Sequence, residues 1–204
     1  MKRKALMVGL CICLMLAATG CKSRVHSLKL ADIKDETVLL RSDGSVQSGA
    51  YEAFDEPYYD EDDLKAFMES AINTFNEEQG EECVKLNKLK IEENGTKHIA
   101  KAIVTYDNMK LYSAMNNIEA ASYSMEEAKE AGVLPEIMTV AADGSRVSQK
   151  EVTDNTEYKV LVIQIKGDIM FPDAVKYYSN VMLLAPNTVE TTGEEQAVIV
   201  YKNK

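Results

Sequence analysis

Residues 52–63 contain seven carboxylate side chains. Among them, the oxygens of Asp55, Asp60 and Asp62 are candidate ligands for a metal ion. Calcium takes about six to eight such oxygens. The spacing does not match an EF-hand loop, however, and acidic residues at the start of a helix also complement the positive end of its dipole. We therefore expect a helix start here and no cofactor, and we keep the three aspartates as metal candidates.

A thiol and an imidazole form the second candidate pair. Cys83 and His98 lie on either side of Asn94-Gly95, a dipeptide that favours a tight hairpin turn, and such a hairpin would bring their strands together. A cysteine beside a histidine is the minimum for an activated nucleophile. Nothing around Cys83 resembles a thiol-protease motif, and a cysteine at a strand edge usually packs as a small apolar side chain. We expect a structural role for Cys83.

Other catalytic patterns are missing from the sequence. It contains no G-x-S-x-G, no G-x-x-x-x-G-K-[ST] and no G-x-G-x-x-G, and its two histidines are too few for a multi-histidine zinc site. Two carboxylates on either side of a bond are sufficient for glycoside hydrolysis, and the 33 Asp and Glu residues offer many pairs. A carboxylate-based hydrolase therefore stays open as an alternative.

The N-terminus indicates a different kind of chemistry. The chain opens with MKRK, and residues 5–20 carry no charge. A membrane-spanning helix needs about 20 apolar residues, so this shorter segment has the outline of a cleaved signal peptide. The residues ATGC at 18–21 resemble the lipobox of bacterial lipoproteins, although Ala18 stands where leucine is commoner. The resemblance covers residues 2–21, and it implies that the thiol of Cys21 receives a diacylglyceryl group before cleavage.

This resemblance divides the chain into three parts. We expect residues 1–20 to be removed as a signal peptide, residues 21–27 to form the lipidated cysteine and its tether, and residues 28–204 to form a single α+β domain. Two acyl chains of about sixteen carbons, at about 0.8 kcal/mol per methylene, would hold the protein on a bilayer. We therefore expect it at the cell membrane, anchored through Cys21 on the extracytoplasmic face.

Net charge limits the classes of molecule that the mature chain could bind, and the cysteine content limits its disulfides. Loss of the leader removes three of the 23 basic residues and none of the 33 acidic ones, which leaves 20 against 33 and a net charge of −13. Such a charge argues against nucleic acid and against docking on anionic headgroups. Cys11 and Cys13 leave with the leader, so Cys83 has no partner for an internal disulfide.

An amphipathic helix over residues 61–79 is the clearest element that would position these groups. Asp60 and Gly80 supply its start and stop signals. Its apolar residues recur at helical spacing, so we expect the whole stripe to lie on a sheet or another helix. The stripe comprises Leu64, Phe67, Met68, Ala71, Ile72 and Phe75.

Two β-hairpins are expected on either side of that helix. Residues 36–54 read as two strands around Asp43-Gly44, and residues 83–106 as two strands around Asn94-Gly95. In the second hairpin the apolar positions change from even to odd numbers, which predicts a bulge near Asn87.

The remaining chain predicts two shorter helices and more strands. The helices run from Asp107 to Met115 and from Ser124 to Gly132, and the strands are 118–123, two segments around Asp143-Gly144, 158–165, 175–184 and 197–201. Strands and helices do not alternate regularly. The sequence therefore predicts an α+β fold with a mostly antiparallel sheet, not a doubly wound parallel one.

These observations favour a non-enzymatic binding or accessory module at the cell envelope. The mature domain resembles the small lipoproteins that have no assigned activity, and its partner would be an envelope protein or polymer. The alternative is a carboxylate-based hydrolase that acts on an envelope or external polymer. A solute-binding lipoprotein is disfavoured, because such proteins usually have two lobes and more residues.

Replacement of Cys21 by alanine tests the anchor. We expect Cys21→Ala to move the protein from the membrane fraction to the soluble fraction, because the acyl chains have no other attachment point. Cell fractionation followed by immunoblotting measures the change. Unchanged fractionation, or an unmodified Cys21 in mass spectra of the native protein, would refute lipidation.

Overall fold

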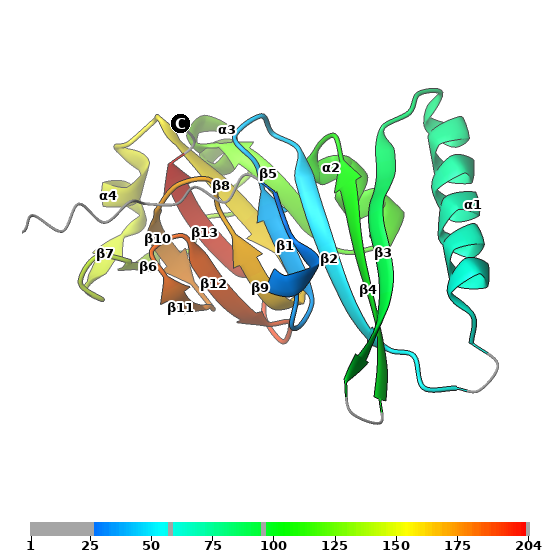
Figure 1. Cartoon of the computed structure of the whole chain (residues 1–204). Helices are drawn as coiled ribbons and strands as arrows, with labels where there is room; N and C mark the ends of the chain where they lie inside the picture. The colour runs from blue at the N-terminus through cyan, green and yellow to red at the C-terminus, as the bar shows by residue number, and fades with distance from the viewer. Residues whose placement is uncertain (1–26, 57–58, 95–96, 203–204) are drawn as a thin grey trace, which may run out of the picture.

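The computed structural model describes residues 27–56, 59–94 and 97–202. The expected leader, the lipidation site Cys21 and tether residues 21–26 lie outside these ranges. Within them, two β-sheets pack against each other, and α1 stands beside the far edge of one sheet (Figure 1). The expected α+β class with mostly antiparallel strands is confirmed.

Sheet A has seven strands in the order β11-β12-β9-β1-β2-β4-β3. The pair β1 and β9 is parallel, and the other pairs are antiparallel. The strands are β1 Thr37–Leu40, β2 Val46–Ala53, β3 Val84–Asn94, β4 Lys97–Tyr106, β9 Lys166–Met170, β11 Met182–Ala185 and β12 Thr188–Thr192.

Sheet B has six strands in the order β5-β8-β13-β10-β6-β7, all antiparallel. The strands are β5 Ala120–Ser124, β6 Ile137–Val140, β7 Arg146–Ser148, β8 Tyr158–Ile163, β10 Val175–Ser179 and β13 Ala197–Lys202.

Short helices and the longer helix α1 pack against the sheets. The helices are η1 Leu30–Asp32, α1 Glu61–Gln79, α2 Met109–Asn116, α3 Met125–Glu130 and α4 Gln149–Thr153. Residues of α3 and α4 bury one face of sheet B, and the segment around η1 covers the outer face of sheet A. Among the described residues, no helix is long and apolar enough to cross a bilayer.

The largest apolar cluster lies between the sheets. Ile169 of β9 and Val189 of β12 share this cluster with Leu161 of β8 and Ile199 of β13, and all four are fully buried. The alternate residues Val160 and Val162 of β8 belong to the second cluster, under α3 and α4. Strand β8 is therefore covered on both faces, which matches its nearly continuous apolar sequence YKVLVI.

Several local predictions are confirmed because each rests on a short-range interaction. The side chain of Asp60 caps α1 by accepting from the backbone N–H groups of Asp62 and Asp63, and Gly80 ends the helix with φ +77°. The β3–β4 register shifts between Leu86 and Lys88, which is the expected bulge. The helix expected from Ser124 is α3, and Ser124 and Glu127 form its capping box.

Other predictions are wrong in ways that tertiary contacts explain. The expected strand 175–184 divides at Asn180, which has φ +59° and sends β10 into sheet B and β11 into sheet A. The Asn180 amide donates to the carbonyl of Gln196 and stabilises this turn. Helix α2 begins at Met109 instead of Asp107, because Asn108 caps it. Strands β9 and β12 and helix α4 were not expected.

The parallel pairing of β1 and β9 requires glycine at position 167. The backbone N–H of Asp168 donates to the carbonyl of Glu36 at 2.8 Å, so the two chains approach closely just before β1. Gly167 adopts φ +143°, and a Cβ there would collide with the backbone carbonyl of Glu36. This close approach fixes the backbone that carries the Glu36 side chain.

Two glycine substitutions separate the collision from the backbone strain. We expect Gly167→Ala to lower the free energy of unfolding by about 3 kcal/mol, because the cost of a positive φ adds to the cost of the steric overlap with the backbone. In Gly44→Ala only the positive φ is unfavourable, since nothing lies within 4 Å of the added Cβ. We expect this variant to lower the free energy of unfolding by about 1 kcal/mol. Chemical denaturation measures both values, and equal losses would contradict the close approach.

Candidate functional site

Helix α1 packs on sheet A through its middle and C-terminal turns, where Met68, Ile72 and Phe75 contact the main apolar cluster. Ile72 is the only residue of its apolar stripe that is buried, at 6% exposure, whereas Phe67, toward the N-terminal end, is 73% exposed. The expectation that all six stripe residues pack on a neighbouring element is therefore wrong. The helix leans on edge strand β3 and leaves an opening over β2 and β4.

The side chain of Asn76 fastens α1 to β3. Its Oδ1 accepts from the backbone N–H of Cys83 at 3.1 Å and of Val84 at 2.9 Å, and its Nδ2 donates to the Val84 carbonyl at 2.9 Å. One carboxamide thus satisfies three backbone groups where β3 begins. The attachment point lies near the end of the helix, so the N-terminal turns extend away from it.

Cys83 belongs to this attachment and does not form a catalytic pair with His98. Its side chain is 2% exposed, and burial raises the pKa of the thiol, which is the opposite of what a nucleophile requires. Val84 pairs with Tyr106, whereas His98 lies eight residues earlier on β4, about 26 Å along the strand. The hairpin brings the two strands together but places these two residues at opposite ends.

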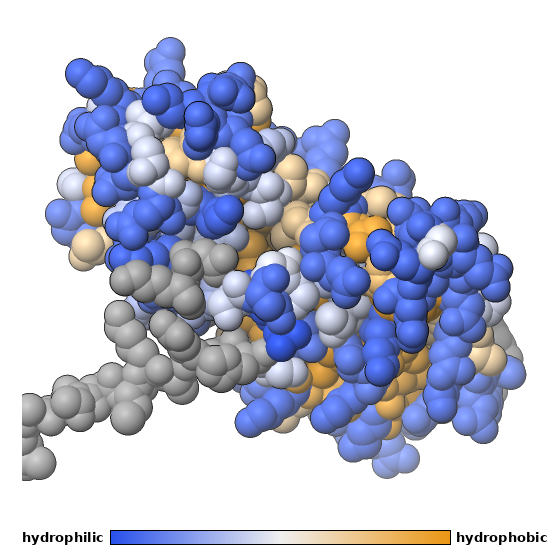
Figure 2. All heavy atoms as spheres, turned by 90° about the horizontal axis from the view of Figure 1, so that it is seen from above, coloured by the Kyte–Doolittle hydropathy of each residue, from blue (hydrophilic) through white to orange (hydrophobic). Residues whose placement is uncertain are grey.

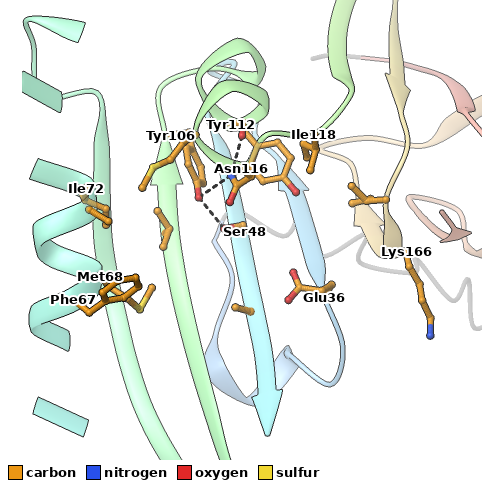
Figure 3. A pocket seen from close by; sticks show the side chains of 15 residues that line it. Glu36, Ser48, Phe67, Met68, Ile72, Tyr106, Tyr112, Asn116, Ile118 and Lys166 are labelled. Carbon is orange, nitrogen blue, oxygen red and sulfur yellow. Dashed lines mark hydrogen bonds between the residues drawn. The ribbon is translucent and has the colours of Figure 1, made fainter. Parts of the chain in front are cut away.

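A cavity of about 430 Å³ fills the opening between α1 and sheet A (Figure 3). Phe67, Met68 and Ile72 of α1 form one wall, and Ile118 and Ile165 lie on the opposite side. The floor is the inner face of β2 and β4, and α2 closes one end. We call this cavity the α1 groove. Its volume is within the usual range of small-molecule sites, about 300–1,000 Å³.

Two buried tyrosines lie at the closed end of the α1 groove. The rings of Tyr106 and Tyr112 meet edge to face at 5.2 Å, and the residues are 2% and 5% exposed. Asn116 Nδ2 donates to the Tyr106 hydroxyl at 3.1 Å and to the backbone carbonyl of Tyr112 at 2.8 Å. Ser48 Oγ lies 3.5 Å from the same Tyr106 hydroxyl. The Tyr106 hydroxyl is therefore satisfied by protein groups.

The hydroxyl of Tyr112 has no such partner among the described residues. Figure 3 shows it on the side of the groove where Glu36 lies. Burial, reinforced by Tyr106 and by the charge of Glu36, raises the pKa of Tyr112, so the hydroxyl stays protonated. A buried polar group without a hydrogen bond is unfavourable and rare in folded proteins. A ligand in the groove would find a donor and acceptor here.

Glu36 places a partly buried carboxyl in the same groove. Burial raises its pKa, the nearby charges of Glu52 and Asp35 raise it further, and a hydrogen bond from the Tyr51 backbone opposes them. No ion pair joins Glu36 to a cation of the described chain. Lys166 also lines the groove, but Figure 3 shows its amine directed away from Glu36. The carboxyl thus accepts a hydrogen bond from the Tyr51 backbone, but its charge is uncompensated by any ion pair in the described chain.

A second carboxyl lies toward the open end of the groove. Ser48 and Ala50 of β2 line the groove, and side chains two residues apart in a strand share a face. Glu52 is the next residue on that face, and it is exposed. The groove thus changes from apolar and tyrosine-lined at α2 to acidic at its mouth.

The metal candidates occupy structural positions near α1. Asp60 caps the helix with its carboxylate, and Asp62 contributes a backbone N–H to that cap. Asp55 accepts from the backbone N–H of His98 at 2.6 Å and so ties the strand ends together. Within the described ranges, no group of three or more His, Cys, Asp or Glu residues could hold a metal ion.

A second hollow of about 670 Å³ lies beside the β1–β2 turn. Three cations line it, but Arg41 pairs there with Asp43 at 3.5 Å. The buried Tyr201 hydroxyl has a hydrogen bond with Ser122. We take the smaller α1 groove as the candidate site, because it holds an unpartnered buried hydroxyl and an uncompensated carboxyl.

Little in the sequence indicated which residues line the groove. Glu36 belongs to no motif, Tyr106 and Tyr112 fall in an expected strand and an expected helix, and Asn116 lies one residue past that helix. The one available signal was in α1, whose six apolar residues include a phenylalanine that the sheet does not cover.

Replacing Glu36 by its amide tests the burial of this carboxyl. The unfolded carboxyl ionises near pKa 4.5 and the folded one at a higher pH, so between these values the folded state binds more protons and stability falls as pH rises. We expect Glu36→Gln to stabilise the protein near pH 7 and to have little effect near pH 4, as followed by thermal unfolding. The charged groups that act on Glu36 are Glu52 and Asp35, with Lys166 at the rim. An equal effect at both pH values would contradict the raised pKa.

Comparison with protein-family models, curated proteins and solved structures finds no match to this chain. A function for it has to come from the contacts, burial and charges of its own residues.

Proposed function

We propose that this chain is a lipid-anchored binding module on the extracytoplasmic face of the cell membrane, and that the α1 groove holds its ligand or partner. The anchor part rests on the charged start, the short apolar segment and the lipobox-like residues at 18–21. The binding part rests on the described domain. The two parts are independent, and each has its own test.

One observation carries the binding part: the α1 groove combines uncovered apolar surface with a buried hydroxyl that has no hydrogen-bond partner among the described residues. Phe67 is 73% exposed and lines the cavity from α1 together with Met68 and Ile72. At the closed end, Tyr112 keeps a buried hydroxyl without a hydrogen bond to any described residue. Ligand sites typically combine an apolar lining with a few polar groups that orient the ligand.

The charge of the protein makes some classes of binding partner unfavourable. Charged and polar side chains cover most of the face in Figure 2, with apolar side chains visible between them. The whole chain carries a net charge of −10. Nucleic acid is therefore a poor partner. An envelope protein or polymer, or a ligand that derives from the envelope, fits the expected location.

The rival function is a carboxylate-based hydrolase. It is favoured by Glu36, whose pKa is raised by burial and by Glu52. A general acid in glycoside hydrolysis needs such a raised pKa, and the second carboxylate would serve as base or nucleophile. This function requires the polymer to enter the mouth of the same groove.

Crosslinking at the groove in intact cells tests the binding function. A photo-crosslinking phenylalanine analogue replaces Phe67 in the full-length chain, and the same analogue replaces Met182 in a control. Met182 is also an exposed apolar residue, at 57%, on the opposite edge strand of sheet A. We expect a discrete adduct from position 67 only, detected by mass spectrometry.

A second substitution shows whether that adduct forms in the groove. Ala71 lines the cavity from α1, so Ala71→Trp should fill it and suppress the adduct. Identical adducts at positions 67 and 182, or an adduct that persists in Ala71→Trp, would refute the groove as the site. Release of fragments from envelope polymers by the purified protein, lost in Glu36→Gln, would support the hydrolase instead.

A further inference from the structure

The uncompensated carboxyl of Glu36 points to the chemistry of the ligand. Its surroundings are acidic or neutral: Glu52 and Asp35 are the charges that raise its pKa, and Tyr112 is a neutral hydroxyl. The amine of Lys166 is directed away from it (Figure 3). A partly buried carboxylate with acidic neighbours is unfavourable unless a cation compensates it. The described chain provides no such cation in an ion pair.

We propose that the α1 groove binds a small amphiphilic cation, an ammonium group on an apolar chain, with the ammonium beside Glu36 and the chain along α1. This assignment rests on the proposed function of the groove as a binding site and names the class of ligand. The ligand is a small molecule because the cavity, about 430 Å³, has the size of a small-molecule site.

The polar end of such a ligand finds complementary groups. An ammonium has three N–H donors and no acceptor. The carboxylate of Glu36 accepts one of them, and the hydroxyl oxygen of Tyr112, which has no partner in the described chain, accepts another. Glu52, toward the mouth, adds negative potential along the path of entry. The charges of Glu36 and Glu52 would disfavour a carboxylate or phosphate ligand.

The apolar end matches the walls of the groove. Phe67, Met68 and Ile72 present apolar side chains from α1, and Ile118 and Ile165 face them across the cavity. Burial of an alkyl chain between these walls would remove exposed surface of Phe67 from water, which is favourable at about 25 cal/mol per Å². The flexible thioether of Met68 can adapt to the shape of the chain.

Isothermal titration calorimetry with three eight-carbon probes tests this assignment. The protein is the full chain carrying Cys21→Ala, so that neither acyl chains nor detergent competes for the groove. We expect octylamine to bind about tenfold more tightly than octanol, and octanoate to bind more weakly than either. In Glu36→Gln, octylamine should lose about tenfold in affinity while octanol is unchanged.

Three further variants test whether octylamine binds inside the α1 groove. Asp168→Asn removes another carboxyl whose pKa is raised by burial and by neighbouring acids, but Asp168 does not line the groove, so octylamine binding should not change. Tyr112→Phe should weaken octylamine binding without loss of stability, because the hydroxyl makes no hydrogen bond to the described chain. Ala71→Trp should weaken all the probes, because it fills the cavity.

The possible failures are distinguishable. Equal affinity for octylamine and octanol, or equal losses of both in Glu36→Gln, would overturn the cation assignment while leaving groove binding intact. Probe binding that is unchanged in Ala71→Trp would overturn the groove itself and, with it, the proposed function. Tighter binding of a capped Leu-Lys-Leu peptide than of octylamine would overturn the small-molecule assignment in favour of a protein segment.

Discussion

The carboxamide of Asn76 holds helix α1 to the rest of the protein, and the α1 groove exists because of where that attachment lies. Its three hydrogen bonds to Cys83 and Val84 complete the backbone pairing at the start of β3. Among the described residues, no side-chain hydrogen bond joins the part of α1 before Ile72 to the sheet. The first turns of the helix stand away from β2 and β4. A helix attached along its whole length would have buried its stripe and left no cavity.

The groove contains unfavourable interactions, and apolar packing elsewhere in the protein offsets them. Glu36 is desolvated beside Glu52, and Tyr112 buries a hydroxyl without a partner among the described residues. Both sheets are stabilised elsewhere by apolar clusters that contain fully buried residues such as Phe171, Leu161 and Met125. Local interactions of this unfavourable kind concentrate at functional sites, because they become favourable only when a ligand arrives. The hydroxyl of Tyr106, in the same groove, accepts a hydrogen bond from Asn116. The Tyr112 hydroxyl differs from it in having no such partner in the described chain.

Local signals predicted much of the fold. The Asp-Gly turn at 43–44 and the cap at Asp60 depend on residues a few positions apart, so the sequence contains them directly. The bulge at Asn87 follows from the alternation of apolar residues within one strand. By contrast, β9 pairs with β1, which lies far away in the sequence. Asn180 splits a continuous β-compatible run because the two halves pair in different sheets. Propensity alone carries no information about which sheet a strand joins.

The sequence by itself determined the class of the fold, the limits of α1 and its apolar stripe, and the acidic charge, because each follows from neighbouring residues or from composition. Only the tertiary structure decided how much of that stripe is covered, and that Glu36, Tyr112 and Phe67 line one cavity. These three residues are separated in sequence by 31 positions or more, and they meet because β2 and β4 pair, α2 closes one end and Asn76 sets the position of α1. Side chains brought together in this way leave no local pattern, so long-range packing alone specifies the candidate site.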